Sequence, residues 1–286
     1  MNMVTSGAPA NPQANDFLTE CRVLHDLVTA MTSAQRQEPS QFKGWTAVDV
    51  IGHLHHTDCA LLVALDGEDA LRRHMTGKQQ AASVGESATS YTRRWHGLDP
   101  AALCEHWLAT AGHVAATFRD IDPRRRIYWG SGPDMSARSA ISARQMEVWS
   151  HGQALFDLMG HVRSESDRLR NVAQICAGTF AWAFRVRGLP APDAPPGLRL
   201  TAPSGAVWEW NDQAGADRIS GSAVEFCQVG TQTRNVADTH LQVEGATARR
   251  WLAIAQCFAG APHDPPAPGT RFRADKMLGR GYGMVR

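Results

Sequence analysis

The stretch ISARQMEVWSHGQALFDLMG, residues 141–160, has the pattern of an amphipathic helix that carries two polar residues on its apolar side. With about 3.6 residues per turn, one apolar stripe is formed by Val148, Ala154, Leu155, Leu158 and Met159. Glu147 and His151 lie four residues apart inside that stripe. Because an unpaired carboxylate is costly to bury, Glu147 needs a partner, and a metal ion shared with His151 supplies one. Hydrogen bonds between the two side chains, or to an arginine, are the alternative that the pattern leaves open.

The run GHLHHTD, residues 52–58, lies in a second predicted helix. The apolar stripe of that helix consists of Val50, Ile51, Leu54, Leu61, Leu62 and Leu65. Asp58 falls near the middle of the stripe and His55 at one margin, whereas His53 lies beyond the other margin. His56 points most nearly away. Periodicity alone therefore favours His55 and Asp58 as the inward polar pair, and it does not single out His53.

Helical patterns extend from about residue 15 to residue 188. Apolar residues at three- and four-residue spacing predict helices over residues 16–31, 46–65, 100–118, 140–159 and 166–186. Over residues 70–98 the pattern is weak and polar, which predicts helix interrupted by irregular linkers. Residues 122–140 are rich in Gly and Pro and predict a long loop. Helices joined in this way are typical of an antiparallel bundle.

The pattern changes after GLPAPDAPPG, residues 188–197, and this stretch predicts a boundary between domains of residues 1–188 and 189–286. Apolar and polar residues then alternate around Pro203-Ser204-Gly205, which predicts a β-hairpin. The patterns that follow predict strands over residues 217–221 and 238–245, helices over 222–230 and 246–260, and an extended tail. The C-terminal part is therefore expected to be a small α+β domain.

Composition excludes several classes of partner. The formal net charge is +1, from 29 basic and 28 acidic residues, so nothing suggests binding to nucleic acid or to an anionic membrane. No signal peptide and no membrane-spanning run is evident, and the six cysteines are scattered without a C-x-x-C pair. We expect reduced cysteines, a cytoplasmic protein and a small-molecule substrate. The sequence does not indicate an oligomeric state.

Two motifs together resemble a known family. GWTAVDVIGHL, residues 44–54, and RQMEVWSHG, residues 144–152, resemble the DinB-like metal-binding superfamily and, within it, the mycothiol-dependent maleylpyruvate isomerase family. The resemblance implies an α+β protein with an N-terminal antiparallel four-helix bundle and a small C-terminal α+β domain of sterol-carrier-like type. Residues 221–260 also resemble the domain labelled "wyosine base formation", although nothing in the chain supports tRNA chemistry.

The resemblance implies a metal site at His53, Glu147 and His151, with these three residues as the catalytic centre. It favours His53 over the His55 that periodicity prefers. Two histidines and a carboxylate with open positions are typical of a catalytic zinc site, although another divalent metal such as nickel or iron suits the same ligands. A zinc ion of this kind binds a thiolate or acts as a Lewis acid. In the resembled isomerases, the thiol adds to the substrate, allows bond rotation and leaves, which implies mycothiol as cosubstrate.

Other polar residues are candidates for the cleft or the surroundings of the metal: His56, Asp58, Ser136, Arg138 and Arg234. His56 lies one turn from His53 and is a candidate fourth ligand. An arginine in the cleft suits an anionic thiol or carboxylate, although a surface ion pair explains such residues equally well. No G-x-S-x-G motif, P-loop or dinucleotide fingerprint is present.

The leading hypothesis is a zinc-dependent isomerase or S-transferase that uses mycothiol on a small electrophilic metabolite. A second hypothesis keeps the metal but not the thiol and describes a Lewis-acid isomerase, cyclase or hydrolase of specialised metabolism. A third is a metal-binding protein without catalytic activity. Metal content combined with thiol-titrated spectroscopy separates the first hypothesis from the other two.

Overall fold

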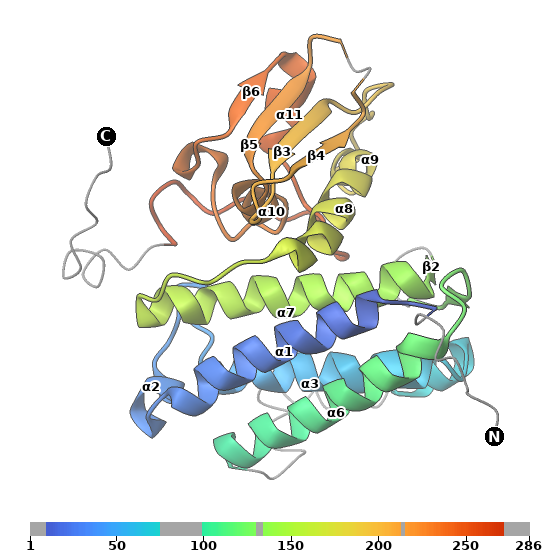
Figure 1. The fold of residues 1–286 in the computed structure, drawn as a ribbon, viewed down its shortest axis with the longest axis vertical. Coiled ribbons are helices and arrows are strands. Elements are labelled where there is room, and N and C mark those ends of the chain that lie inside the picture. The colour runs from blue at the N-terminus through green and yellow to red at the C-terminus, as the bar shows by residue number, and fades with distance from the viewer. Residues whose placement is uncertain (1–9, 75–98, 130–133, 213–214, 272–286) are drawn as a thin grey trace, which may run out of the picture. The chain divides into compact units, whose positions relative to one another are not determined.

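The computed structural model describes residues 10–74, 99–129, 134–212 and 215–271. Within these ranges, long helices come first in the chain and a small sheet with shorter helices follows (Figure 1). This arrangement confirms the predicted α+β class, with an N-terminal helical domain and a small C-terminal sheet domain. None of the helices in the described ranges combines the length and the apolar character that crossing a membrane requires.

The four longest helices of the described ranges are α1 (Gln13–Ala30), α3 (Ala47–Ala64), α6 (Pro100–Asp120) and α7 (Ala137–Met159). Helix α6 begins where the sequence predicts, because Pro100 occupies its first turn and the Asp99 carboxylate accepts the backbone N–H groups of Ala101 and Ala102 at 2.8 and 3.0 Å. A short helix, α2 (Ser33–Gln37), follows α1 and was not predicted.

Helices α1 and α6 pack against each other in antiparallel directions. The backbone N–H of Asn11 donates to the carbonyl of Arg119 at 3.1 Å, next to the start of α1. Further along α1, His25 Nε2 lies 2.8 Å from Glu105 Oε1. Residue numbers therefore rise along α1 while they fall along α6. The core between the long helices is apolar and includes the fully buried Phe17, Leu24, Ile51, Leu54, Leu103, Trp107, Phe118 and Ile141.

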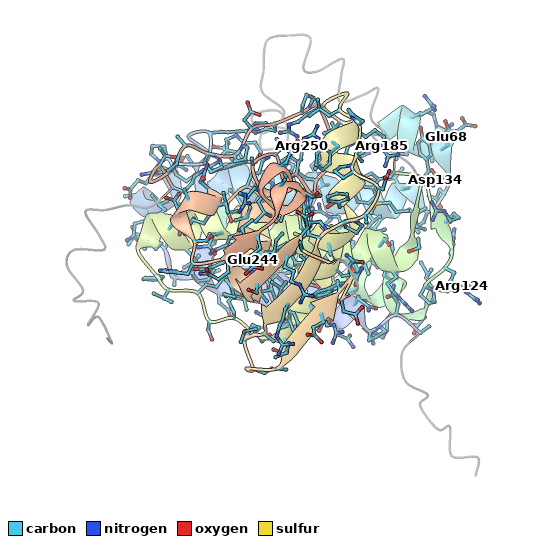
Figure 2. All side chains as sticks on the ribbon, turned by 90° about the horizontal axis from the view of Figure 1, so that it is seen from above. Glu68, Arg124, Asp134, Arg185, Glu244 and Arg250 are labelled. Atoms are coloured by element: carbon cyan, nitrogen blue, oxygen red, sulfur yellow. The ribbon has the colours of Figure 1, made fainter. Side chains whose placement is uncertain are left out.

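Charged side chains of both signs are exposed along the described parts of the chain. Figure 2 labels six exposed examples from different parts of the chain, Glu68, Arg124, Asp134, Arg185, Glu244 and Arg250. Exposed side chains of both signs thus occur in the helical part and in the sheet part of the described chain.

Contacts within the chain define two compact units, Met1–Gln37 with Val48–Val148, and Glu38–Ala47 with Trp149–Arg286. Helix α7 is continuous through the point at which this division falls. The second unit contains α8 (Arg170–Gly178) and α9 (Phe180–Arg185) as well as the C-terminal sheet. The domain boundary predicted at residue 188 stays a prediction.

The C-terminal sheet has the strand order β4-β3-β5-β6. Its strands are β3 (Gly197–Thr201), β4 (Val207–Trp210), β5 (Arg218–Ser222) and β6 (Gln242–Glu244), and the helices α10 (Ala223–Gly230) and α11 (Ala246–Leu252) follow β5 and β6. The predicted hairpin is confirmed, since β3 and β4 pair antiparallel with Leu200 opposite Trp208. Its turn contains Gly205 at φ 87°, a left-handed conformation that favours glycine. Strand β5 pairs parallel with β3, and β6 antiparallel with β5.

Three predicted elements differ from the structure. The helix predicted over residues 166–186 is divided into a 3-10 turn (Asp167–Leu169), α8 and α9, because Thr179 leaves helical geometry and its hydroxyl donates to the carbonyls of Ile175 and Cys176. The helix predicted over residues 246–260 ends at Leu252. The predicted loop over residues 122–140 contains the paired strands β1 (Arg126–Ile127) and β2 (Met135–Ser136) and the start of α7. In the weak region, residues 68–74 are helical, and the prediction for residues 75–98 lies outside the described residues.

Candidate metal centre

His53, Glu147 and His151 lie close together. His53 projects from α3, whereas Glu147 and His151 stand one turn apart on α7. One ligand atom from each side chain lies within 4.8 Å of the other two. His53 Nε2 is 3.4 Å from Glu147 Oε2, and these side chains are 26 % and 22 % exposed. The three groups are thus shielded but still accessible to a small ion.

The donor set suits a divalent metal ion. Zinc binds imidazole nitrogen and carboxylate oxygen at about 2.0–2.2 Å, so neighbouring ligand atoms of a tetrahedral site lie about 3.3–3.5 Å apart. The 3.4 Å between His53 and Glu147 falls in that range. Among the described residues, no fourth His, Cys, Asp or Glu joins this group. Three protein ligands are the number found in catalytic rather than structural zinc sites.

Two aromatic rings enclose the His151 imidazole. Trp45 stacks on it, with 5.4 Å between ring centroids and 12° between ring planes. Phe42 meets it edge-on at 5.1 Å and 70°. Trp45 belongs to the GWT motif of the sequence analysis, whereas no sequence pattern gave Phe42 a role. A stack of this kind fixes the plane of an imidazole and thereby the direction of its nitrogen lone pair.

Asp58 lies in the helical core and has two strong partners. Arg144 Nε donates to Asp58 Oδ1 at 2.9 Å, and Trp107 Nε1 donates to Asp58 Oδ2 at 3.0 Å. Burial raises the pKa of the Asp58 carboxyl, although the Arg144 guanidinium and the two hydrogen bonds act in the opposite direction. Asp58 is thus inward, as periodicity predicts, but its two oxygens are occupied by Arg144 and Trp107. Arg144 was missed, although it lies three residues before Glu147 and so on a neighbouring part of the helix face.

The other two histidines of the run are buried outside the metal-ligand group. His55 is 3 % exposed and His56 is 5 % exposed. His56 stacks on His74, with 5.1 Å between ring centroids and 17° between ring planes. Periodicity was therefore right about the burial of His55 but wrong about His56, which it placed on the outward side and which stacks on His74 instead. The group of converging ligand atoms contains His53 rather than either of them.

Ser136, Arg138 and Arg234 have other surroundings. The Ser136 hydroxyl accepts the backbone N–H of Ser139 at 3.1 Å, which is the contact of a residue that caps the start of α7. Arg138 is exposed. Arg234 is buried and makes a two-pronged ion pair with Asp157 of α7, with N···O distances of 2.7 and 2.6 Å. Ser136 and Arg234 thus have structural contacts, and the expectation that they and Arg138 line the cleft stays a prediction.

The chain is similar to one described family and to two uncharacterised proteins. A family model described as the mycothiol maleylpyruvate isomerase N-terminal domain matches residues 17–156. Two uncharacterised proteins, from two strains of Mycobacterium tuberculosis, are each 35% identical to the chain over 257 residues, which is 89% of this chain and 98% of the relative. A crystal structure of the mycothiol-dependent maleylpyruvate isomerase aligns with a TM-score of 0.49 and 17% identity, over 77% of this chain and 88% of that one. A mutant of that enzyme gives 0.48 and 18% over the same shares.

Proposed function

The chain belongs to the family of the mycothiol maleylpyruvate isomerase N-terminal domain, and from this premise we propose that it is a metal-dependent enzyme that uses mycothiol to isomerise or S-conjugate a small electrophilic metabolite. The observation that carries the proposal is the convergence of His53, Glu147 and His151 within 4.8 Å. We propose zinc as the metal, and a small-molecule substrate as the partner. The cytoplasmic location and the absence of nucleic-acid and membrane partners stay predictions.

The residues of the proposed site have two roles: some bind the metal, and others orient one of the ligands. His53, Glu147 and His151 hold the metal, which when bound supplies a Lewis acid that lowers the pKa of a thiol. Glu147 contributes a negative charge that a divalent cation offsets. Trp45 and Phe42 shield one side of His151 from water and fix the orientation of its ring.

The thiols of Cys21, Cys59 and Cys104 are poor candidates for a nucleophile. Burial raises the pKa of the Cys59 thiol to about 11 and that of the Cys104 thiol to about 12. The pKa of the Cys21 thiol is also raised, by burial first and by the Asp58 charge second. Because the thiolate is the nucleophile, cysteines of this kind are inert near neutral pH. This supports a low-molecular-weight thiol as cosubstrate rather than a nucleophilic cysteine of the protein.

Cobalt(II) substitution tests the proposal. Cobalt accepts the same nitrogen and oxygen ligands as zinc and is visible in absorption spectra. Titration of the cobalt-loaded protein with mycothiol should produce a new near-ultraviolet band from sulfur-to-metal charge transfer. The S-methylated thiol, which cannot form a thiolate, is the matched control and should leave the spectrum unchanged. The variant His53→Ala should show neither cobalt binding nor the band.

The outcome separates the proposed function from its alternatives. If cobalt binds but mycothiol produces no band, the thiol-dependent function is wrong, and the two alternatives that remain are a Lewis-acid enzyme without a thiol and a metal-binding protein without catalytic activity. If neither cobalt nor zinc binds to the wild-type protein, the metal site itself is wrong.

A further inference from the structure

The loop that carries Phe42 and Trp45 has a strained backbone. Lys43 and Gly44 are both in the left-handed region, with φ angles of 53° and 69°. A lysine rarely adopts this conformation, so the surrounding structure has to hold it there. Within the loop, the Trp45 N–H donates to the Phe42 carbonyl and the Ser40 N–H to the Trp45 carbonyl, each at 2.9 Å. These hydrogen bonds close the turn but do not anchor it to the rest of the chain.

Arg271 supplies an anchor from 230 residues away in the sequence. Its Nη1 donates to the Gln41 carbonyl at 3.2 Å. Its guanidinium also lies over the Phe42 ring, 5.2 Å from the centroid. A cation over an aromatic face is attracted by the negative charge density of that face, most strongly where water is partly excluded. Arg271 therefore contacts the loop at two points, the Gln41 carbonyl and the Phe42 ring. The Phe42 ring in turn contacts His151.

The segment that ends in Arg271 is itself attached to the C-terminal domain. The backbone N–H of Gly269 donates to both oxygens of Asp238, at 2.9 and 3.0 Å. Asn235 Nδ2 donates to the Pro266 carbonyl at 2.8 Å. These bonds come from the loop after α10, so they hold the residues directly before Arg271 in a defined place.

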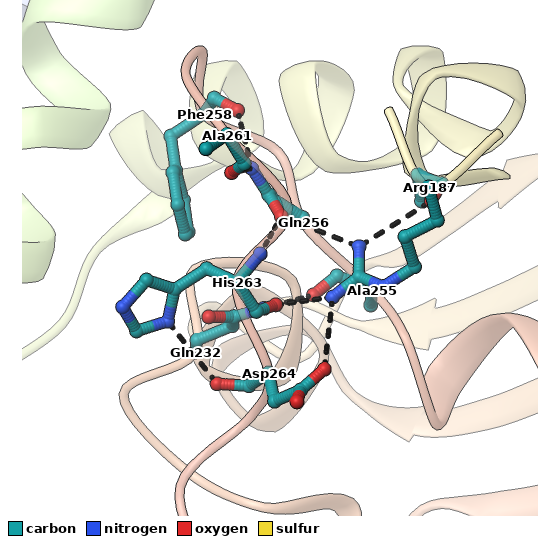
Figure 3. A network of polar contacts seen from close by, with 9 residues as sticks. Arg187, Gln232, Ala255, Gln256, Phe258, Ala261, His263 and Asp264 are labelled. Atoms are coloured by element: carbon teal, nitrogen blue, oxygen red, sulfur yellow. Dashed lines mark hydrogen bonds and ion pairs between the residues drawn. The ribbon is translucent and has the colours of Figure 1, made fainter. Parts of the chain in front are cut away.

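A second group of bonds holds the start of the same segment (Figure 3). Gln232 Nε2 donates to the carbonyls of Ala255 and His263, at 2.9 and 2.7 Å. Gln256 accepts the His263 N–H at 2.9 Å through its side-chain oxygen. Arg187 bonds to the His263 carbonyl and lies 3.5 Å from the Asp264 carboxylate. The chain from His263 to Arg271 is thus held at both ends by residues of the second compact unit.

We propose that the segment 263–271 acts through Arg271 as a positioning element for the metal ligand His151. Arg271 holds Phe42 and its loop, and the loop holds Trp45 and Phe42 against the imidazole, so the ring is oriented before a metal arrives. This inference rests on the proposed function, because it assumes that His151 binds a metal. It assigns control over metal affinity to Arg271, whose contacts in the described chain are with Gln41 and Phe42 of the loop.

Zinc affinity of the full-length protein tests the inference. Affinities are measured by competition with a chromogenic chelator for the wild type, Arg271→Ala and Arg271→Lys. Loss of residues that orient a metal ligand typically weakens metal binding about 10–100-fold, and we expect Trp45→Leu to fall near the lower end. Because Arg271 acts through the loop, Arg271→Ala should raise the zinc dissociation constant about 3–10-fold. Arg271→Lys keeps a cation and a donor and should restore most of the affinity.

Arg218→Ala is the matched control. Arg218 is exposed, stands in β5 and donates Nε to one backbone carbonyl, that of Gly215, at 3.1 Å. It has no contact with the loop among those described, so its loss should leave zinc affinity unchanged. The visible spectrum of bound cobalt(II) gives a second readout, because it depends on ligand geometry and not on stability. It should change in Arg271→Ala and not in Arg218→Ala.

Two results would overturn the inference, and they differ from each other. If wild-type protein binds zinc and Arg271→Ala binds it equally tightly with an unchanged cobalt spectrum, the positioning role is wrong while the proposed metal site stands. If wild-type protein binds no metal, the proposed function fails first and the inference fails with it.

Discussion

Asp58 and Arg144 form an ion pair between α3 and α7, with 2.9 Å between Oδ1 and Nε and side chains that are 0 % and 3 % exposed. On the same pair of helices, His53 Nε2 faces Glu147 Oε2 at 3.4 Å. From 58 to 53 the residue number falls on α3, and from 144 to 147 it rises on α7, so both contacts belong to one antiparallel interface. A slip of one turn, about 5.4 Å, would break both contacts together. The buried pair therefore sets the register that brings His53 to Glu147.

Replacing Arg144 by Ala should destabilise the protein strongly. The substitution leaves the Asp58 carboxylate in a fully buried position with only the Trp107 N–H as a partner. Loss of one member of a buried ion pair typically costs about 3–5 kcal/mol of unfolding free energy. Chemical denaturation at pH 7, in the presence of chelator, measures this cost without any contribution from metal binding.

The loss of unfolding free energy in Arg144→Ala should also depend on pH. Burial already raises the pKa of Asp58 in the folded state, and removal of Arg144, which lowers it, should raise it further. A group whose folded-state pKa is raised contributes stability that is present below its unfolded pKa and is lost as pH rises through the folded pKa. The deficit should therefore shrink as pH falls from 7 towards about 4. Adding Asp58→Asn should abolish this dependence, and a deficit that grows on acidification would contradict the explanation.

Replacement of His53 and replacement of His55 should have different effects on metal binding. Helical periodicity favours His55 as the inward residue, whereas His53 belongs to the group of converging ligand atoms. Wild-type protein prepared with zinc should contain about one divalent ion per chain. His53→Ala should lose that metal, because one of the three converging ligands is gone. His55→Ala should retain it, since His55 lies outside the group. Elemental analysis by mass spectrometry after dialysis decides the question, and metal loss in His55→Ala with retention in His53→Ala would reverse the assignment.

Glu147→Gln should separate metal binding from folding. The amide keeps the shape of the side chain, is cheaper to bury than a carboxylate, and is a weaker ligand. Zinc at about a hundredfold excess over its dissociation constant stabilises a protein by about 2.7 kcal/mol, which raises the melting temperature of a chain of this size by about 5–10 °C. The wild type should show such a rise and the variant little of it. Equal zinc-induced shifts in both proteins would mean that Glu147 is not a ligand.

Ser136→Ala should affect the helix and not the metal. Ser136 accepts the N–H of Ser139 at the start of α7, eleven residues before Glu147, which is about 16 Å along the helix. Loss of such a cap typically costs about 1 kcal/mol. Denaturation should therefore show a modest loss of stability, while zinc competition should give the wild-type affinity. A large loss of zinc affinity would instead indicate that Ser136 lies in the cleft near the metal.

Local sequence patterns determined most of the elements of this protein. The three- and four-residue spacing of apolar side chains predicted the long helices, and alternation around Gly205 predicted the hairpin. In one of the places where the prediction failed, a local hydrogen bond competed with the helix: the Thr179 hydroxyl donates to carbonyls of the preceding turn, and the predicted helix is interrupted there. The motifs of residues 44–54 and 144–152 also identified the three residues that converge, although periodicity preferred His55.

Only the tertiary structure decided which partner each polar side chain meets. Burial follows from the side of a helix on which a residue lies, so Asp58 and His55 were predictable as inward residues. The partners of Asp58 lie on two other helices, at sequence separations of 49 and 86 residues that no local period encodes. The Asp58 oxygens meet Arg144 and Trp107, and the oxygen of Glu147 meets His53, because folding brings α3 beside α7 in the register that the buried Asp58–Arg144 pair fixes. The Phe42 ring beside His151 has the same origin, since a loop is placed by contacts such as that of Arg271 and not by its own sequence.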